Sequence, residues 1–162
     1  LTNLLTDIPE MTIATDKVDL EMIAKPRKMN IGFIRKFMIV FGLASSIFDY
    51  LTFGVLLYIL KAGPDEFRTG WLVESVISAS LIVLVIRSSQ PFYRSRPGKW
   101  LLVATFLMIA ITLLLPYSPI AIKMGMVPLP ARFYPWLGGI IIFYIATAEL
   151  LKKIFYKMLK QG

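Results

Sequence analysis

Residues 37–60 have the sequence FMIVFGLASSIFDYLTFGVLLYIL, and this stretch decides the fold. Its only charged side chain is that of Asp49. About 20 mostly apolar residues are enough for a helix to cross the roughly 30 Å hydrocarbon core of a bilayer, because a helix rises about 1.5 Å per residue. We therefore predict a transmembrane helix over residues 37–60.

Three further apolar stretches, residues 70–86, 100–115 and 134–151, predict three more spans. The composition agrees, since 57% of the 162 residues are hydrophobic and 17% are charged, whereas a soluble domain has about 45–50% apolar and about 25% charged residues. Residues 1–14 resemble the last turns of a further membrane helix, so that the chain is expected to be a fragment. We predict an all-α membrane protein with four complete transmembrane helices.

The basic residues are concentrated in alternate connections. Residues 15–36 contain six Lys and Arg, residues 61–69 two, residues 87–99 four, residues 116–133 two and residues 152–162 four. Because loops rich in Lys and Arg stay in the cytoplasm, the connection 15–36, the loop 87–99 and the tail are predicted to be cytoplasmic. The net charge of +8 then reflects topology in a cell membrane and its lipids, and we expect no nucleic-acid partner.

The chain contains neither cysteine nor histidine. A cation site would therefore consist of carboxylate, amide, hydroxyl and carbonyl oxygens, which suit hard ions such as magnesium and calcium. The sequence also has no Asp-Lys-Thr-Gly phosphorylation motif, no glycine-rich P-loop and no Ser/His or Cys/His pair. We expect no catalytic residue here and no ATP hydrolysis by this chain alone.

Asn3, Thr6 and Asp7 are the first candidate ligands. Their i, i+3, i+4 spacing places an amide, a hydroxyl and a carboxylate on one face of a helix. Pro9 should disturb that helix and free carbonyl groups, as in the broken helices that form cation sites in transporters. The alternative is an ordinary helix end with capping side chains.

Glu74 is the second candidate, because Ser78 lies at i+4 on the same face of the predicted span. A carboxylate and a hydroxyl so placed could complete a cation site. The alternative is an interfacial glutamate within reach of Arg68.

Asp49 is a possible further ligand, since a charge at mid-span is costly unless something compensates it. Ser45, Ser46 and Thr52 lie within one turn of it. Gly42 and Ser46 form a small-xxx-small pair, which favours close helix packing. The favoured interpretation is structural: Asp49 accepts hydrogen bonds from a neighbouring helix.

Glu149 falls at the cytoplasmic end of the last predicted span and is followed by Lys152 and Lys153. The i,i+3 and i,i+4 spacings predict an ion pair at the membrane interface. We assign it no role in ion binding.

The order of several short motifs resembles P-type cation-transporting ATPases, in particular the magnesium-translocating type of bacteria. The resemblance covers nearly the whole chain. Its motifs are Asn3-Leu4-Leu5-Thr6-Asp7, Met11-Thr12-Ile13-Ala14-Thr15-Asp16, Ser45-Ser46-Ile47-Phe48-Asp49, Phe67-Arg68-Thr69-Gly70-Trp71, Val73-Glu74-Ser75 and Leu115-Pro116-Tyr117-Ser118-Pro119.

The resemblance implies that the four spans are helices seven to ten of a ten-helix pump and that residues 1–14 end helix six. It implies that Asn3, Thr6, Asp7 and Glu74 contribute to an intramembrane site for a divalent cation, with magnesium as the leading ion. It implies that the partners are the preceding helices and the cytoplasmic ATPase domains, where magnesium also accompanies ATP. We expect this chain alone to bind cations weakly or not at all.

Three alternatives remain at this point. The chain could belong to a pump for calcium or another cation. It could also be a non-catalytic four-helix accessory protein, although an opening in the middle of a motif argues against that. Thirdly, it could be half of a secondary transporter. Such a protein is expected to show an internal repeat, and this sequence shows none.

Overall fold

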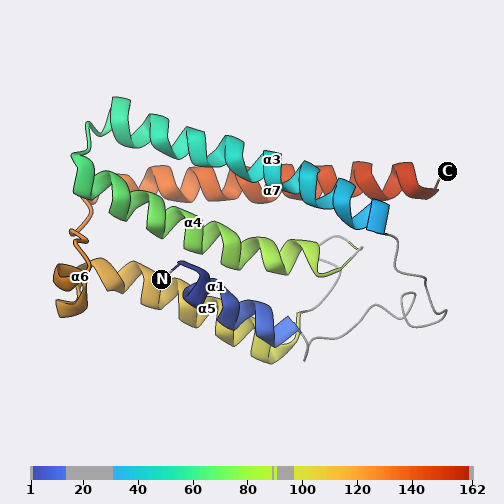
Figure 1. Ribbon diagram of the computed structural model, residues 1–162, viewed down its shortest axis with the longest axis horizontal. Coiled ribbons are helices and arrows are strands. Elements are labelled where there is room, and N and C mark those ends of the chain that lie inside the picture. Colours follow the sequence, from blue (N-terminus) through green and yellow to red (C-terminus); the bar gives the residue numbers. More distant parts are fainter. Residues whose placement is uncertain (1, 14–30, 89, 91–96, 161–162) are drawn as a thin grey trace.

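The computed structural model describes residues 2–13, 31–88, 90 and 97–160, and all the elements in these ranges are helices (Figure 1). Four long helices, α3, α4, α5 and α7, lie side by side in alternating directions, and α1 lies against α4 and α5. The elements are α1 (Thr2–Thr12), α3 (Ile31–Gly54), the π-helical turn η2 (Val55–Ile59), α4 (Pro64–Ile86), α5 (Lys99–Leu114), the 3-10 turn η3 (Leu115–Tyr117), α6 (Pro119–Lys123) and α7 (Phe133–Lys160).

Three helical segments in the described ranges are long and apolar enough to cross a membrane: Ile34–Ile59, Pro64–Ile86 and Lys99–Tyr117. They include the first three predicted spans, and the chain is therefore an all-α membrane protein. The fourth predicted span, residues 134–151, lies inside α7, which has 28 residues but is not among these three segments. The residues 14–30 of the predicted cytoplasmic connection lie outside the described ranges.

Helix α4 is the centre of the bundle, because it packs against α1, α3, α5 and α7. Its apolar residues take part in three separate clusters. Val73 and Ile77 pack against η2 and α7, Val76 packs against Leu5 of α1 and Met108 of α5, and Val85 packs against Phe41 and Ala148. Apolar side chains on several faces of α4 are thus packed against the neighbouring helices.

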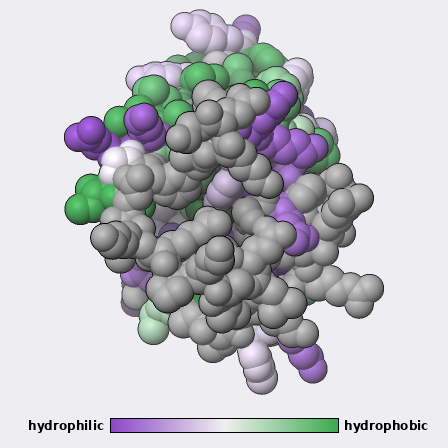
Figure 2. Space-filling view, turned by 90° about the vertical axis from the view of Figure 1, so that its right-hand side faces the viewer, coloured by the Kyte–Doolittle hydropathy of each residue, from purple (hydrophilic) through white to green (hydrophobic). Residues whose placement is uncertain are grey.

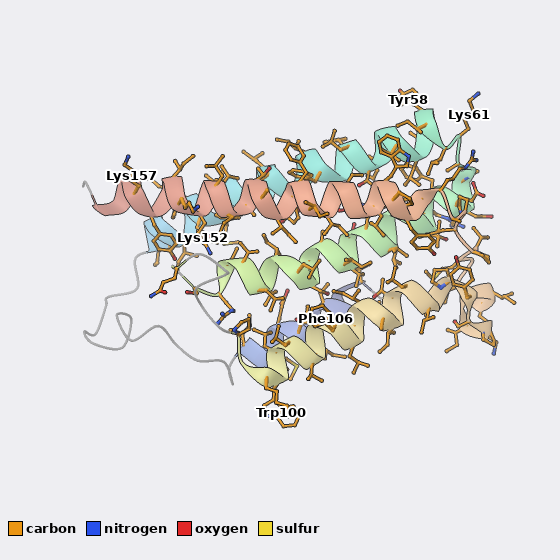
Figure 3. The ribbon with its side chains drawn as sticks, turned by 180° about the vertical axis from the view of Figure 1, so that it is seen from behind. Tyr58, Lys61, Trp100, Phe106, Lys152 and Lys157 are labelled. Atoms are coloured by element: carbon orange, nitrogen blue, oxygen red, sulfur yellow. The ribbon has the colours of Figure 1, made fainter. Side chains whose placement is uncertain are left out.

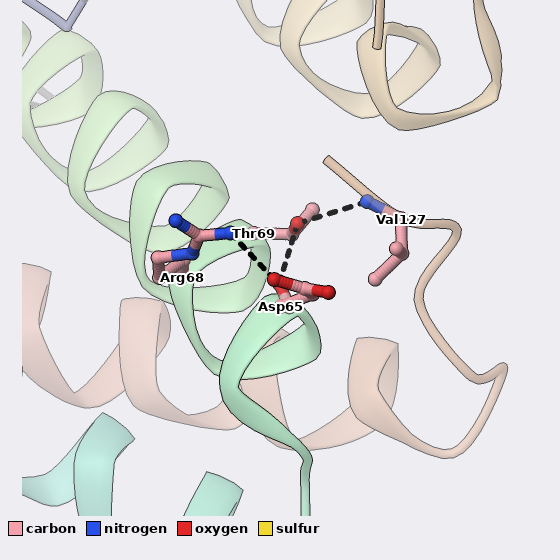
Figure 4. Close-up of polar contacts among 4 residues, drawn as sticks. All are labelled: Asp65, Arg68, Thr69 and Val127. Atoms are coloured by element: carbon pink, nitrogen blue, oxygen red, sulfur yellow. Dashed lines mark hydrogen bonds and ion pairs between the residues drawn. The ribbon is translucent and has the colours of Figure 1, made fainter. Parts of the chain in front are cut away.

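Polar contacts at the start of α4 join it to the loop that precedes α7 (Figure 4). The Thr69 hydroxyl donates to the Asp65 carbonyl at 2.8 Å and accepts from the Val127 amide at 3.1 Å. Arg68 forms an ion pair with Asp65 one turn earlier. The loop over residues 116–133, predicted to be irregular, is therefore held in place and contains the short helix α6.

The Gly42–Ser46 pair does not pack against another helix in the described part of the chain, contrary to expectation. Both residues are exposed, and a Cβ atom added at Gly42 would meet nothing within 4 Å. The packed face of α3 contains Phe41, Ala44 and Phe48 instead. Phe48 contacts the rings of Phe143 and Tyr144 of α7, and such van der Waals packing is what holds helices together in a membrane.

Basic side chains gather at the end of the bundle where α3 and α5 begin and where α4 and α7 end. Figure 2 looks onto this end and shows hydrophilic side chains around its edge. Figure 3 places Lys152 and Lys157 at this end and Lys61 at the other. The basic residues of this end, within the described ranges, include Arg35, Lys36, Arg87, Lys99, Lys152, Lys153 and Lys157.

Candidate intramembrane cation site

Helix α1 carries the first group of predicted ligands. Asp7 is exposed on this chain, and Thr6 is half-buried with its hydroxyl donating to the Thr2 carbonyl at 3.3 Å. Asn3 lies one turn before Thr6 in the same helix, and its side chain is outside the described part. The helix thus presents the Asp7 carboxylate away from the packed core of the bundle.

Pro9 lies inside α1, and the helix continues through it to Thr12. The predicted disturbance is therefore not a break in the helix. Proline has no amide hydrogen, so the carbonyl of Leu5 loses its usual helical donor. The Thr12 hydroxyl donates to the Pro9 carbonyl at 2.7 Å, which supports the last turn of α1. Pro9 therefore leaves the Leu5 carbonyl, in the turn that contains Asp7, without its usual helical hydrogen bond.

Glu74 is almost completely buried in α4, with a relative exposure of 1%. Ser78 at i+4 is close enough to interact with its carboxylate, and the Ser78 hydroxyl donates to the Ser75 carbonyl at 3.1 Å. Its Oε2 atom has no hydrogen-bond partner among the residues that the structure describes. Arg68 pairs with Asp65 instead, so the alternative of an interfacial Glu74 paired with Arg68 is wrong.

Asp49 accepts hydrogen bonds from α4, as the structural interpretation predicted. Its Oδ1 atom accepts from the Trp71 indole Nε1 at 3.0 Å and from the Ser75 hydroxyl at 3.4 Å. The carboxylate is therefore partly satisfied by donors from the protein. These two bonds fix α3 against α4 at mid-span.

Asp49 and Glu74 belong to one polar cluster between α3, α4 and α7. The two carboxyl groups lie close enough to interact, and the Tyr144 side chain of α7 lies near both. Tyr144 is buried and forms a side-chain hydrogen bond with Ser45 of α3. We call this group the polar cluster; its members are Ser45, Asp49, Glu74, Ser75, Ser78 and Tyr144.

The structure does not bring Glu74 and Asp7 to one point. Val76 contacts α1 and α5, and Glu74 precedes it by two residues, which is about 200° around a helix with 3.6 residues per turn. Glu74 therefore faces α3 and α7, whereas Asp7 belongs to the helix on the opposite side of α4. Within the described ranges, no three acidic side chains are grouped so that they could hold a metal ion.

Sequence reasoning missed Tyr144, which lies in an apolar stretch of α7 where its polar neighbour at helical spacing is Thr147, at i+3. It also missed Thr105 of α5, whose fully buried hydroxyl has no hydrogen-bond partner in the described part of the chain. The oxygen atoms of these side chains and of Asp7 and Glu74 are the kind of ligand that hard divalent cations prefer.

The bundle combines apolar helices with buried acidic and hydroxyl side chains, and ionisable residues inside membrane helices often mark ion pathways. The sequence matches the family model "Cation transporting ATPase, C-terminus" over residues 1–154, and the chain belongs to this family. It is 35% identical over 164 residues to "Magnesium-transporting ATPase, P-type 1" of Salmonella typhimurium strain LT2, covering 98% of this chain. It is 36% identical over 158 residues to the protein of the same name in Escherichia coli K12, covering 94% of this chain. The chain spans 18% of the length of each of these relatives.

Proposed function

We propose that this chain is the carboxy-terminal membrane part of a P-type pump that transports a divalent cation, with magnesium as the leading ion. Family membership supports the cation pump, and the relatives named magnesium-transporting support the ion. The remaining helices and the ATP-hydrolysing domains would come from other parts of the pump, since the chain corresponds to 18% of such a protein.

The proposed topology has four spans, with α7 as the fourth and the basic end of the bundle in the cytoplasm of a bacterial or archaeal cell. The alternation of helix directions supports it, because α7 runs antiparallel to α5 and packs along α3 and α4. The concentration of Lys and Arg at one end supports the orientation.

We propose that the cation passes two sets of oxygens in this chain. Asp7, with Thr6 and Asn3, forms one set on α1, which neighbouring helices of the pump would cover. Glu74, with Ser78 and the Asp49 carboxylate nearby, forms the other. The observation that carries the proposal is the Glu74 carboxylate, because it is buried in a membrane helix and one of its oxygens has no hydrogen-bond partner among the described residues. Such a group is energetically costly, and ionisable residues kept inside membrane helices mark ion pathways.

The test is transport by the complete pump in liposomes that contain an ion-sensitive dye. Magnesium, calcium and manganese are supplied separately outside the liposomes. ATP itself requires magnesium, so the dye signal that this magnesium alone produces is subtracted. We expect Asp7→Asn and Glu74→Gln each to lower the rate of transport of one ion at least about tenfold, which corresponds to roughly 1.4 kcal/mol.

The matched control is Glu66→Gln, which removes a half-buried carboxylate in the first turn of the same helix as Glu74, where the amide oxygen of Gln can still accept from the Gly63 amide. It should leave transport unchanged. Transport of calcium or manganese but not magnesium would assign a different ion. Transport of no cation by the unmodified pump, or transport unaffected by both substitutions, would contradict the proposal.

A further inference from the structure

Lys152 of α7 is buried at the end of α4, with a relative exposure of 1% (Figure 3). Its Nζ atom donates to the Val85 carbonyl at 2.7 Å and to the Gln90 carbonyl at 2.8 Å. It also forms an ion pair with the Glu149 Oε2 atom at 3.0 Å. The sequence predicted this pair at the membrane interface, and the structure adds that both residues are buried in the bundle.

These contacts compensate an expensive burial. An ammonium group removed from water must be paired and hydrogen-bonded, and a lysine has three hydrogens to donate. Val85 is the residue before the last of α4, so its carbonyl is one of the four at the end of the helix that lack a helical donor. These carbonyls also carry the negative end of the helix dipole, which favours a cation. Lys152 therefore caps α4 from another helix.

Glu149 has a different part in this arrangement. Neither of its carboxylate oxygens accepts a hydrogen bond in the described part of the chain, so Lys152 is the group that compensates its charge. Directly beside the pair, Val85 packs against Phe41 and Ala148, which leaves the end of α4 little freedom to shift along α7.

We propose that Lys152 is a positioning residue that locks the end of α4 to α7, so that the two helices move as one body during transport. The consequence for the ion rests on the function proposed above. Glu74 precedes Val85 by 11 residues, about 16 Å along a helix, so a fixed end sets the depth of the Glu74 carboxylate in the membrane. Locking thereby keeps Glu74 at a constant height relative to α7.

The direct test is hydrogen exchange in the complete pump, followed on peptides that contain residues 83–90. We expect Lys152→Met to raise amide exchange at the end of α4 about tenfold or more, since hydrogen bonds to a charged group are lost. The matched control is Lys153→Met, which removes the neighbouring, exposed lysine and should not change exchange. Unchanged exchange in Lys152→Met would overturn the locking role, whether or not the pump transports an ion.

The second readout is the KM for the transported cation, normalised to the amount of folded pump. Lys152→Met should raise this KM about fivefold or more, and Lys152→Arg should restore part of the loss because its guanidinium can still donate to both carbonyls. A merely structural lysine would lower the yield of folded pump and leave KM unchanged.

Lys152→Met alone leaves the Glu149 charge buried and unpaired, which often prevents folding. The variant Glu149→Gln/Lys152→Met removes both charges and keeps the Val85 and Gln90 carbonyls without their donor. We expect it to fold and still to show the raised exchange and KM. A folded double variant with the exchange and KM of the unmodified pump would contradict the proposal, whereas an unmodified pump that transports no cation would contradict only the proposed function.

Discussion

Single residues decide how the polar groups inside this bundle are satisfied. Asp49 shows this most clearly, because one carboxylate oxygen accepts from both Trp71 and Ser75 of the neighbouring helix. The contribution of the Trp71–Asp49 hydrogen bond to stability can be separated from any role of Asp49 in ion binding. The Trp71 indole only donates and cannot ligate a cation, so changing it removes the bond alone.

We expect Trp71→Phe and Asp49→Ala to destabilise the pump by similar amounts and to be coupled. Interhelical hydrogen bonds in membranes contribute about 0.6 kcal/mol on average and up to about 1.7 kcal/mol, and the coupling energy should fall in this range. The measurement is unfolding in mixed micelles for both single variants and the double variant. Trp100→Phe, at an indole that is 68% exposed, is the control and should change stability little. Strictly additive effects of the two variants would show that the bond contributes nothing.

The sequence predicted contacts within one helix, and for Asp49 it predicted hydrogen bonds from a neighbouring helix without saying which residues donate them. The spacing of Glu74 and Ser78 was enough to predict their contact, because residues four apart in a helix are neighbours. Tyr144 was not predictable, since its place beside Asp49 and Glu74 depends on how α7 is rotated against α3 and α4. The burial of Lys152 depends on the same rotation, because periodicity places it on a helix face without saying what that face contacts.

At the scale of the elements, the four long helices follow from hydropathy, but their ends do not. Helix α4 begins at Pro64, six residues before the predicted span, because Gly63 and the Glu66 carboxylate, which accepts from the Gly63 amide at 3.2 Å, cap the helix outside the apolar stretch. Hydropathy marks the apolar part of a helix, whereas caps mark its ends. Likewise, the proline-rich loop contains α6, since Pro119 can occupy the first turn of a helix.

The approach of α4 to η2 depends on Gly70. A Cβ atom there would lie 2.8 Å from Cδ2 of Leu56 and 3.5 Å from Cε2 of Phe133, and both side chains are buried. We expect Gly70→Val to destabilise the pump by about 1–3 kcal/mol through overpacking. Thermal unfolding in detergent measures the loss. Gly42→Val introduces the same side chain into α3 where the described chain leaves open space, and it should cost less than about 0.5 kcal/mol. Equal losses at the two glycines would indicate a general effect of valine in these helices.

At the scale of the whole molecule, one question decides the topology, namely whether α7 crosses the membrane. Three helical segments meet the criteria of length and hydropathy. If α7 crosses as well, Lys123 of α6 and Lys153 of α7 lie on opposite sides of the membrane. If α7 does not cross, they lie on the same side. Both side chains are exposed, and the chain has no cysteine, so each position can carry a unique thiol in a pump whose other cysteines have been replaced.

We expect Lys123→Cys to react with a membrane-impermeant maleimide added to intact cells, and Lys153→Cys to react only after the membrane is permeabilised. The physical reason is that four Lys and Arg lie in residues 152–162 and two in residues 116–133, and a basic segment is retained in the cytoplasm. The difference in labelling before permeabilisation should be about tenfold or more, because a charged reagent crosses the hydrocarbon core at a cost of several kcal/mol. The opposite labelling pattern would keep four spans but invert the orientation. Equal labelling of both thiols in intact cells would show that α7 does not cross the membrane, and that the basic end does not set the topology.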